Sequence, residues 1–352
     1  MIASSIPRLL TPPGKAGQPY VTSLYDGEMF YIPLSLSNTR LLVTGDETEN
    51  AFAIVGSGGT ASAPIGFHFH REAHDVFLCL QGQMNVWAAN QCRTMNPGDF
   101  ASVPPTVVHQ YQIISQHTEF IGLIVPGNWI DFFRFVGEPY AGCLFPTSDA
   151  RNPMETIVPK IIAASEKFDM VPVRDHPFVA PQPWKEGEDI SIPDGVEPYF
   201  LRAYSGQKWI LGGILDRPLI TETQSNGRFS IASIQGSVKH KSLLRQASAI
   251  KFDKVHHCIL VVEGRLDLEI EGTKVVVAAQ ELAYIPSKTA FSLGFGSSHA
   301  QAYIFANGGG IEKIIRTLGT TYEPHTIPDE PVGEHTVEML RALGQEQGFT
   351  IV

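Results

Sequence analysis

Two nearby segments of this 352-residue chain decide its fold: GFHFHREAHDVFLCLQG at residues 66–82 and NPGDFASVPPTVVHQYQI at residues 96–113. Apolar and polar residues alternate in the first, as along a β-strand whose successive side chains point to opposite faces. We therefore expect His68 and His70 on one face, with Asp75 opening the next apolar run and His109 in a second extended stretch. Imidazoles and a carboxylate on neighbouring strands predict a transition-metal site, because neutral imidazole binds copper, iron, nickel and zinc.

Both segments resemble the two motifs of the cupin superfamily. The first motif runs His-x-His, three or four residues, Glu, six residues and Gly; the second runs Gly, five residues, Pro, a short gap and His. With ENAFAIVG at 49–56 and TEFIGLIVPGNWIDFF at 118–133, the chain is most similar to the fungal quercetin 2,3-dioxygenases, copper bicupins that open a flavonol ring with O2. This resemblance implies an all-β bicupin of two double-stranded β-helix (jelly-roll) barrels with a few short helices.

The resemblance also implies the metal ligands, which are His68, His70, Asp75 and His109. Asp75 departs from the pattern, because the family carries Glu there, and that Glu can bind the metal and accept the proton of the flavonol hydroxyl. Since Asp is one methylene shorter, either Asp75 still ligates, or three histidines hold the metal with Asp75 nearby as the catalytic base. His74 could replace Asp75 as a ligand, although strand alternation predicts that it faces the other way.

The interior of the first barrel is expected to be apolar and aromatic. The resemblance to quercetinases implies six substrate-lining residues, which are Phe77, Tyr111, Phe120, Gly122, Ile124 and Trp129. Phe77 and Tyr111 also share strand parity with Asp75 and His109. Flat aromatic walls suit a planar polycyclic or phenolic ligand; alternatively, these residues simply fill the barrel, as in small barrels.

An internal repeat relates the two halves at a constant offset of 182 residues, which superimposes Gly82 on Gly264 and Pro104 on Pro286. At this offset the four ligand positions fall on Ile250, Phe252, His257 and Phe291. We therefore expect one divalent metal per chain, held by the first half. The expected domains are an N-terminal cupin barrel with the metal site at 1–150, a linker with a helix and a lid role at 151–200, and a degenerate cupin barrel with terminal helices at 201–352.

Helices are expected to be few. The pattern predicts short helices at residues 129–136 and 153–168. Apolar residues at helical spacing predict two more at 311–318 and 337–343, with Gly319 placed as a C-terminal cap of the former.

Composition and charge exclude several classes of partner. The net charge is −10 and no cluster of five or more Lys/Arg occurs, which argues against nucleic acid and anionic membranes. No apolar run approaches the roughly 18 residues of a transmembrane helix. Because the start lacks an apolar signal region and Cys79, Cys92, Cys143 and Cys258 show no paired spacing, we expect free thiols and an intracellular, cytoplasmic protein. Secreted relatives exist, so a removed signal peptide would make it a secreted one.

These observations lead to one functional hypothesis and two alternatives. The hypothesis is a metal-dependent, O2-using dioxygenase that cleaves a ring or C–C bond of a phenolic or enolic, polyketide-like or flavonol-like aromatic substrate. Copper or iron is the preferred metal, and nickel, cobalt and manganese suit the same ligands; related bicupins commonly form homodimers. The alternatives are a non-oxidative cupin isomerase, decarboxylase or cyclase of fungal secondary metabolism, and a non-catalytic ligand-binding bicupin.

Overall fold

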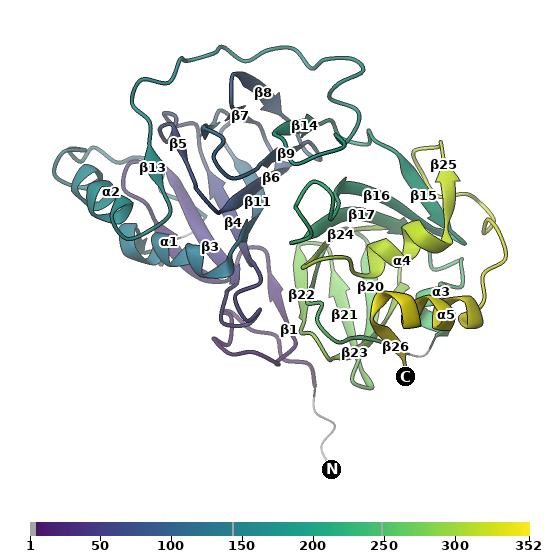
Figure 1. Ribbon diagram of the computed structural model, residues 1–352. Coiled ribbons are helices and arrows are strands. Elements are labelled where there is room, and N and C mark those ends of the chain that lie inside the picture. Colours follow the sequence, from purple (N-terminus) through teal and green to yellow (C-terminus); the bar gives the residue numbers. More distant parts are fainter. Residues whose placement is uncertain (1–4, 143, 248) are drawn as a thin grey trace. The chain divides into compact units, whose positions relative to one another are not determined.

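The computed structural model describes residues 5–142, 144–247 and 249–352, and the chain forms two compact units (Figure 1). One unit is Tyr25–Ser205, and the other combines Met1–Leu24 with Gly206–Val352. Each unit contains an eight-stranded and a five-stranded antiparallel sheet, with only short helices. The expected all-β fold of two barrels with few helices is confirmed.

In the unit Tyr25–Ser205, the sheets surround the predicted metal motif. The eight-stranded sheet has the order β12 (Glu138–Pro139), β2 (Glu28–Tyr31), β3 (Ser37–Val43), β4 (Ala53–Gly59), β11 (Thr118–Val125), β6 (His74–Gln81), β9 (Phe100–Val103) and β14 (Tyr199–Leu201). The five-stranded sheet has the order β13 (Val171–Pro172), β5 (His68–Phe69), β10 (His109–Ile113), β7 (Met84–Ala88) and β8 (Gln91–Met95).

The second unit repeats this topology strand for strand. Its eight-stranded sheet has the order β25 (Thr320–Tyr322), β15 (Lys208–Leu211), β16 (Ile214–Ile220), β17 (Ser230–Gly236), β24 (Ala300–Ala306), β19 (His257–Glu263), β22 (Glu281–Ile285) and β1 (Tyr20–Ser23). Its five-stranded sheet has the order β26 (Phe349–Ile351), β18 (Ile250–Phe252), β23 (Ala290–Phe295), β20 (Arg265–Ile270) and β21 (Thr273–Ala278). Strands β6 to β12 fall on β19 to β25 at the 182-residue offset, so the internal repeat is a repeat of structure.

Edge strands from distant parts of the chain complete both large sheets. Strand β1 pairs with β22, with Tyr20 opposite Tyr284, and β14 pairs with β9, with Tyr199 opposite Ser102. For this reason the compact units differ from the expected domain ranges: the described residues up to Leu24 belong with the second barrel, and the whole linker at 151–200 belongs with the first. Backbone pairing between such distant segments leaves no local sequence signal.

The helices lie where periodicity predicted them, with one addition. A 3-10 turn, η1 (Gly127–Ile130), leads into α1 (Asp131–Val136), and α2 (Ile157–Ser165), α4 (Ile311–Leu318) and α5 (Val337–Gln347) follow. The additional helix is a single turn, α3 (Leu243–Gln246). Gly319 ends α4 in an extended conformation, with φ −79°, rather than as a left-handed cap. Gly348 has that role in α5, with φ 75°.

The interior of the first barrel follows the period-two pattern. Phe77 and Cys79, which share parity with Asp75, belong to one buried apolar cluster together with Val86 and Phe120. Cys79, Cys92 and Cys258 are buried free thiols, as expected, and Cys143 lies outside the described residues. No helix in the described ranges is long and apolar enough to cross a membrane.

Candidate metal centre

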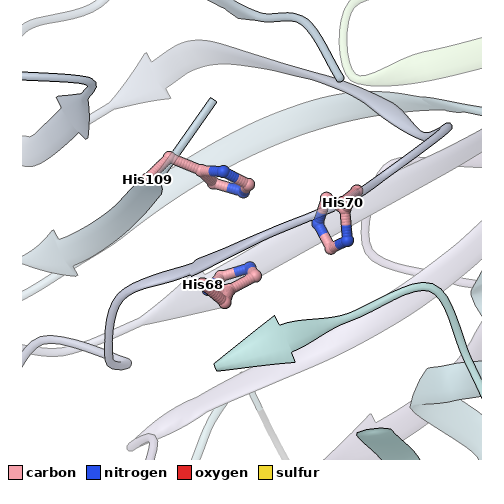
Figure 2. A group of neighbouring side chains, drawn as sticks. All are labelled: His68, His70 and His109. Atoms are coloured by element: carbon pink, nitrogen blue, oxygen red, sulfur yellow. The ribbon is translucent and has the colours of Figure 1, made fainter. Parts of the chain in front are cut away.

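Three histidines converge on one point of the first barrel. Strands β5 and β10 pair so that His109 lies directly opposite His68, and His70 follows at the end of β5. One ligand atom of each of the three lies within 4.8 Å of the others. Figure 2 shows the three rings gathered together. The structure thus brings together the three imidazoles that the sequence motif predicted.

Each of the three rings is oriented by a hydrogen bond from its Nδ1 atom to a backbone carbonyl. The Nδ1 atom of His68 lies 3.0 Å from the Gly66 carbonyl, that of His109 lies 2.9 Å from the Val107 carbonyl, and that of His70 contacts the Asp169 carbonyl. A carbonyl only accepts, so each Nδ1 donates and each Nε2 keeps its lone pair. The Nε2 atoms of His70 and His109 are buried and make no hydrogen bond with any described residue. This donor set, with orphaned Nε2 atoms, fits a transition metal.

Asp75 lies beside this cluster despite its shorter side chain. Its Oδ2 atom is 3.2 Å from Nε2 of His70 and 3.4 Å from Nε2 of His109. Its Oδ1 atom is buried and makes no hydrogen bond within the described ranges. The tightest ligand group contains only the three histidines. The position of Asp75 therefore suits both roles expected for it: a weak fourth ligand of the metal, or a base next to a metal held by three histidines.

The electrostatics of the site favour a cation. Burial, together with the nearby imidazoles of His109 and His70, holds the pKa of His68 well below its ordinary value. Burial alone would raise the pKa of Asp75, but the electrostatic influence of the adjacent His70 and His109 lowers it far below its usual range. An ionised carboxylate beside a neutral imidazole provides both the charge and the lone pair that a divalent metal requires.

His74, the alternative ligand, faces away from the histidine cluster. Its Nε2 atom lies 2.9 Å from the Ser102 hydroxyl, and it is not part of the ligand group. The second barrel repeats this contact at the same offset, because Nδ1 of His256 lies 2.8 Å from the Tyr284 hydroxyl. Because both barrels contain this contact, it joins neighbouring strands as part of the fold. This agrees with strand alternation, which predicts that His74 faces away from the metal site.

A cavity of about 1170 Å³ opens beside the histidines. All six residues that the sequence predicted as substrate-lining line it: Phe77, Tyr111, Phe120, Gly122, Ile124 and Trp129. The ring of Tyr111 lies 5.8 Å from that of Phe77 and 5.0 Å from that of Phe120, measured between centroids. A Cβ atom added at Gly122 would meet the Val76 carbonyl at 2.9 Å, so only glycine fits there. These residues bound an open space and do not simply fill the barrel.

The linker contributes more to this site than the sequence indicated. Helix α2 lines the cavity with Ile157, Val158, Ile161 and Ile162, and the segment after it adds Met170, Pro172, Val173, Arg174 and Phe178. Asp169, in the same segment, contacts His70 through its backbone carbonyl. None of these residues was predicted to line the site, although a helix was expected at 153–168. The helical spacing of the isoleucines in α2 is the signal that could have indicated an apolar face.

The four equivalent positions in the second barrel pack against one another. The ring of His257 lies 4.8 Å from that of Phe252 and 5.1 Å from that of Phe291, and Ile250 is buried in the same cluster. Burial, with the neighbouring His256, lowers the pKa of His257 to about 3. Aromatic and aliphatic side chains thus occupy the space that the imidazoles surround in the first barrel.

The chain is similar to several known proteins. Residues 55–124 match the family described as Cupin domain. Quercetin 2,3-dioxygenase from Bacillus subtilis (strain 168) is 22% identical over 317 residues, which cover 90% of each chain, and that from Aspergillus japonicus is 24% identical over 321 residues, which cover 82% of this chain and 89% of that protein. A structure of oxalate decarboxylase from Bacillus subtilis at pH 4.6 aligns with a TM-score of 0.46 and 15% identity, covering 84% of this chain and 78% of that one. Residues 55–124 therefore form a cupin domain, in a chain of two barrels of the same topology that is similar to the two quercetin 2,3-dioxygenases over most of its length.

Proposed function

We propose that this protein is a metal-dependent dioxygenase that uses O2 to cleave a ring or C–C bond of a phenolic or enolic aromatic substrate. The observation that carries the proposal is the convergence of His68, His70 and His109, with Asp75 beside them, at the wall of an aromatic cavity. The quercetin dioxygenases that match most of the chain support the same class of reaction.

The three Nε2 atoms would hold the metal, with Asp75 as a fourth ligand or as its neighbour. Copper or iron is our proposal for the metal, because imidazole suits both, while nickel, cobalt and manganese remain compatible with this ligand set. When bound, such a metal supplies the Lewis acidity and redox chemistry of the reaction.

Asp75 is the proposed base. Asp75 lines the cavity next to the imidazoles of His70 and His109, where its carboxylate is placed to accept a proton from a substrate hydroxyl. A base of this kind acts across about 2.6–3.2 Å, directly or through one water. The walls formed by Phe77, Tyr111 and Phe120 would hold the ring of the substrate in place and exclude water from the anion that forms.

The cavity favours a large, uncharged substrate. Its volume exceeds the range of about 300–1,000 Å³ that is typical of small-molecule pockets. Apart from Asp75, with His68 and His109 beside it, Arg174 is the only charged residue among the described residues that line the cavity. The additional apolar surface comes from α2, so we propose a phenolic polyketide-like molecule larger than a flavonol, with quercetin turned over poorly.

Oxygen uptake by the metal-loaded protein tests this function. We expect O2 consumption with members of a panel of phenolic and enolic polyketides, and little with quercetin. Conversion of a panel member without O2 uptake would establish a non-oxidative isomerase, decarboxylase or cyclase instead. Efficient quercetin cleavage with release of carbon monoxide would refute the substrate proposal while leaving the dioxygenase class intact.

A further inference from the structure

Asp169 lies in the linker between helix α2 and strand β13, far from the ligand motif in sequence. We propose that Asp169 is a positioning residue that sets the orientation of the metal ligand His70 and of the cavity wall Trp129. This inference rests on the proposed function only in taking His70 as a metal ligand.

The backbone carbonyl of Asp169 serves two residues of the site at once. It accepts a hydrogen bond from Nδ1 of His70 and another, of 2.9 Å, from Nε1 of Trp129. A carbonyl oxygen has two lone pairs, so both are used. The two rings it holds meet edge to face, with centroids 4.8 Å apart. One peptide group therefore sets the angle at which Nε2 of His70 and the Trp129 wall face the cavity.

The carboxylate of Asp169 holds the turn that joins two site residues. Oδ1 accepts from the backbone N–H of Arg71 at 2.6 Å, and Oδ2 accepts from those of Glu72 and Ala73 at 2.7 and 3.1 Å. Hydrogen bonds to an ionised acceptor are about twice as strong as neutral ones. Because these three residues lie between His70 and Asp75, the carboxylate fixes the segment that carries both.

Strand pairing fixes the same segment from its other side. Val171 pairs with Phe69 and Pro172 with His68, so the residues just after Asp169 extend the sheet next to the ligand strand. The linker thus contacts the chain on both sides of His70. Strand β13 pairs with the residues before it, and the Asp169 carboxylate holds the turn after it.

Among the three histidines, only the ring of His70 is hydrogen-bonded to a distant segment. The Nδ1 partners of His68 and His109 are carbonyls two residues away, whereas the partner of His70 is 99 residues away. Local backbone geometry orients the first two rings, but the third has no such support. Loss of the Asp169 carboxylate should therefore disturb one metal ligand selectively.

Metal binding by the full-length chain tests the role of Asp169. Metal-free wild type, Asp169→Ala and Asp169→Asn would be titrated with Co(II) against a competing chelator, and the visible absorption of bound Co(II) would report its geometry. We expect Asp169→Ala to weaken Co(II) binding about 10- to 100-fold, as typical for loss of a group that orients a ligand, and to shift the absorption bands. The Co(II) affinity of Asp169→Asn should lie between those of the wild type and Asp169→Ala. Its amide oxygen still accepts a hydrogen bond, but its NH2 group is a donor that faces another donor, a backbone N–H.

The matched control is Asp99→Asn. The Asp99 carboxylate also accepts from the backbone N–H of Asn96 in a turn and from that of the distant residue Ala203, and none of its hydrogen bonds with described residues reaches the site. We expect it to bind Co(II) as wild type does. The proposal would be overturned if Asp169→Ala bound Co(II) with the affinity and spectrum of the wild type, or if Asp99→Asn lost as much Co(II) affinity as Asp169→Ala. If the alanine variant does not fold, wild-type Co(II) binding by Asp169→Asn would overturn it. Because no substrate or O2 is present, failure of the dioxygenase proposal would leave this result unaffected.

Discussion

Asp75 is the residue at which this chain departs from the motif it resembles. A carboxylate one methylene shorter than Glu still reaches the imidazoles, because the Nε2 atoms of His70 and His109 lie only 3.2 and 3.4 Å from its Oδ2. Its other oxygen lacks a hydrogen-bond partner among the described residues. An orphaned, buried carboxylate oxygen costs free energy, which substrate or metal contacts would offset.

We expect Asp75→Asn to lower kcat by about 10²–10⁴-fold, the usual contribution of a general base, while most of the metal stays bound. An amide oxygen can still coordinate weakly, but it does not accept a proton near neutral pH. Steady-state O2 uptake, together with elemental analysis of the same sample, measures both effects. Wild-type turnover in this variant would remove Asp75 from the mechanism.

Strand β16 and helix α4 of the second barrel bury an unusual carboxylate. Asp216, in β16, is fully buried, and neither of its oxygens hydrogen-bonds to a described residue. Burial, and to a lesser extent Glu312, raises its pKa well above the ordinary value, although Arg316 and Arg217 act in the opposite direction. Such a group contributes to stability below its unfolded pKa, and this contribution is lost as the pH rises through the folded pKa.

Asp216→Asn should therefore match the wild type in acid and become more stable than it at higher pH. The amide resembles the protonated acid in shape but cannot ionise, and each unit by which the folded pKa is raised corresponds to about 1.4 kcal/mol. Urea unfolding of both proteins at a series of pH values measures the difference in free energy. A difference that stays constant with pH would contradict the raised pKa.

At the scale of the whole molecule, two barrels of the same topology contain one converging group of three histidines within the described residues. The equivalents of the ligands in the second barrel are packed rings and an isoleucine, of which only His257 can coordinate. A single imidazole in an apolar cluster does not hold a metal, because neutral-pH affinity needs several converging donors.

Elemental analysis is expected to find one transition metal per chain. His109→Ala should remove most of it, since it deletes one of three imidazoles. His257→Ala, at the position equivalent to Asp75, is the matched control and should retain one metal. A second metal in the wild type would contradict this division between the barrels.

Deletion of the first 24 residues should destabilise the second barrel selectively. Tyr20, Val21 and Thr22 of β1 are buried against β22, and burial of one Val side chain alone contributes about 1.5–3 kcal/mol. Hydrogen exchange should accelerate at the newly exposed edge, residues 281–285, and stay slow in β9, whose edge partner β14 remains. Unchanged protection of β22 would show that β1 is dispensable.

Local patterns predicted much of this protein. The spacing around His68 and His109 indicated strands, a metal site and the inward direction of Phe77 and Tyr111, because strand alternation and motif spacing act over a few residues. The other residues predicted to line the cavity were implied by the resemblance to quercetinases. The 182-residue offset likewise indicated a second barrel with Phe252 and Phe291 in place of imidazoles. The homodimer and the intracellular location remain predictions from the sequence.

Tertiary structure alone decided which distant segments complete the barrels and support the site. The edge strands β1 and β14, and the contact of Asp169 with His70 and Trp129, join residues far apart in the chain. These contacts use backbone hydrogen-bonding groups, which every residue carries except for the missing N–H of proline. Since a backbone carbonyl has no sequence signature, only the folded chain determines which one a histidine ring meets.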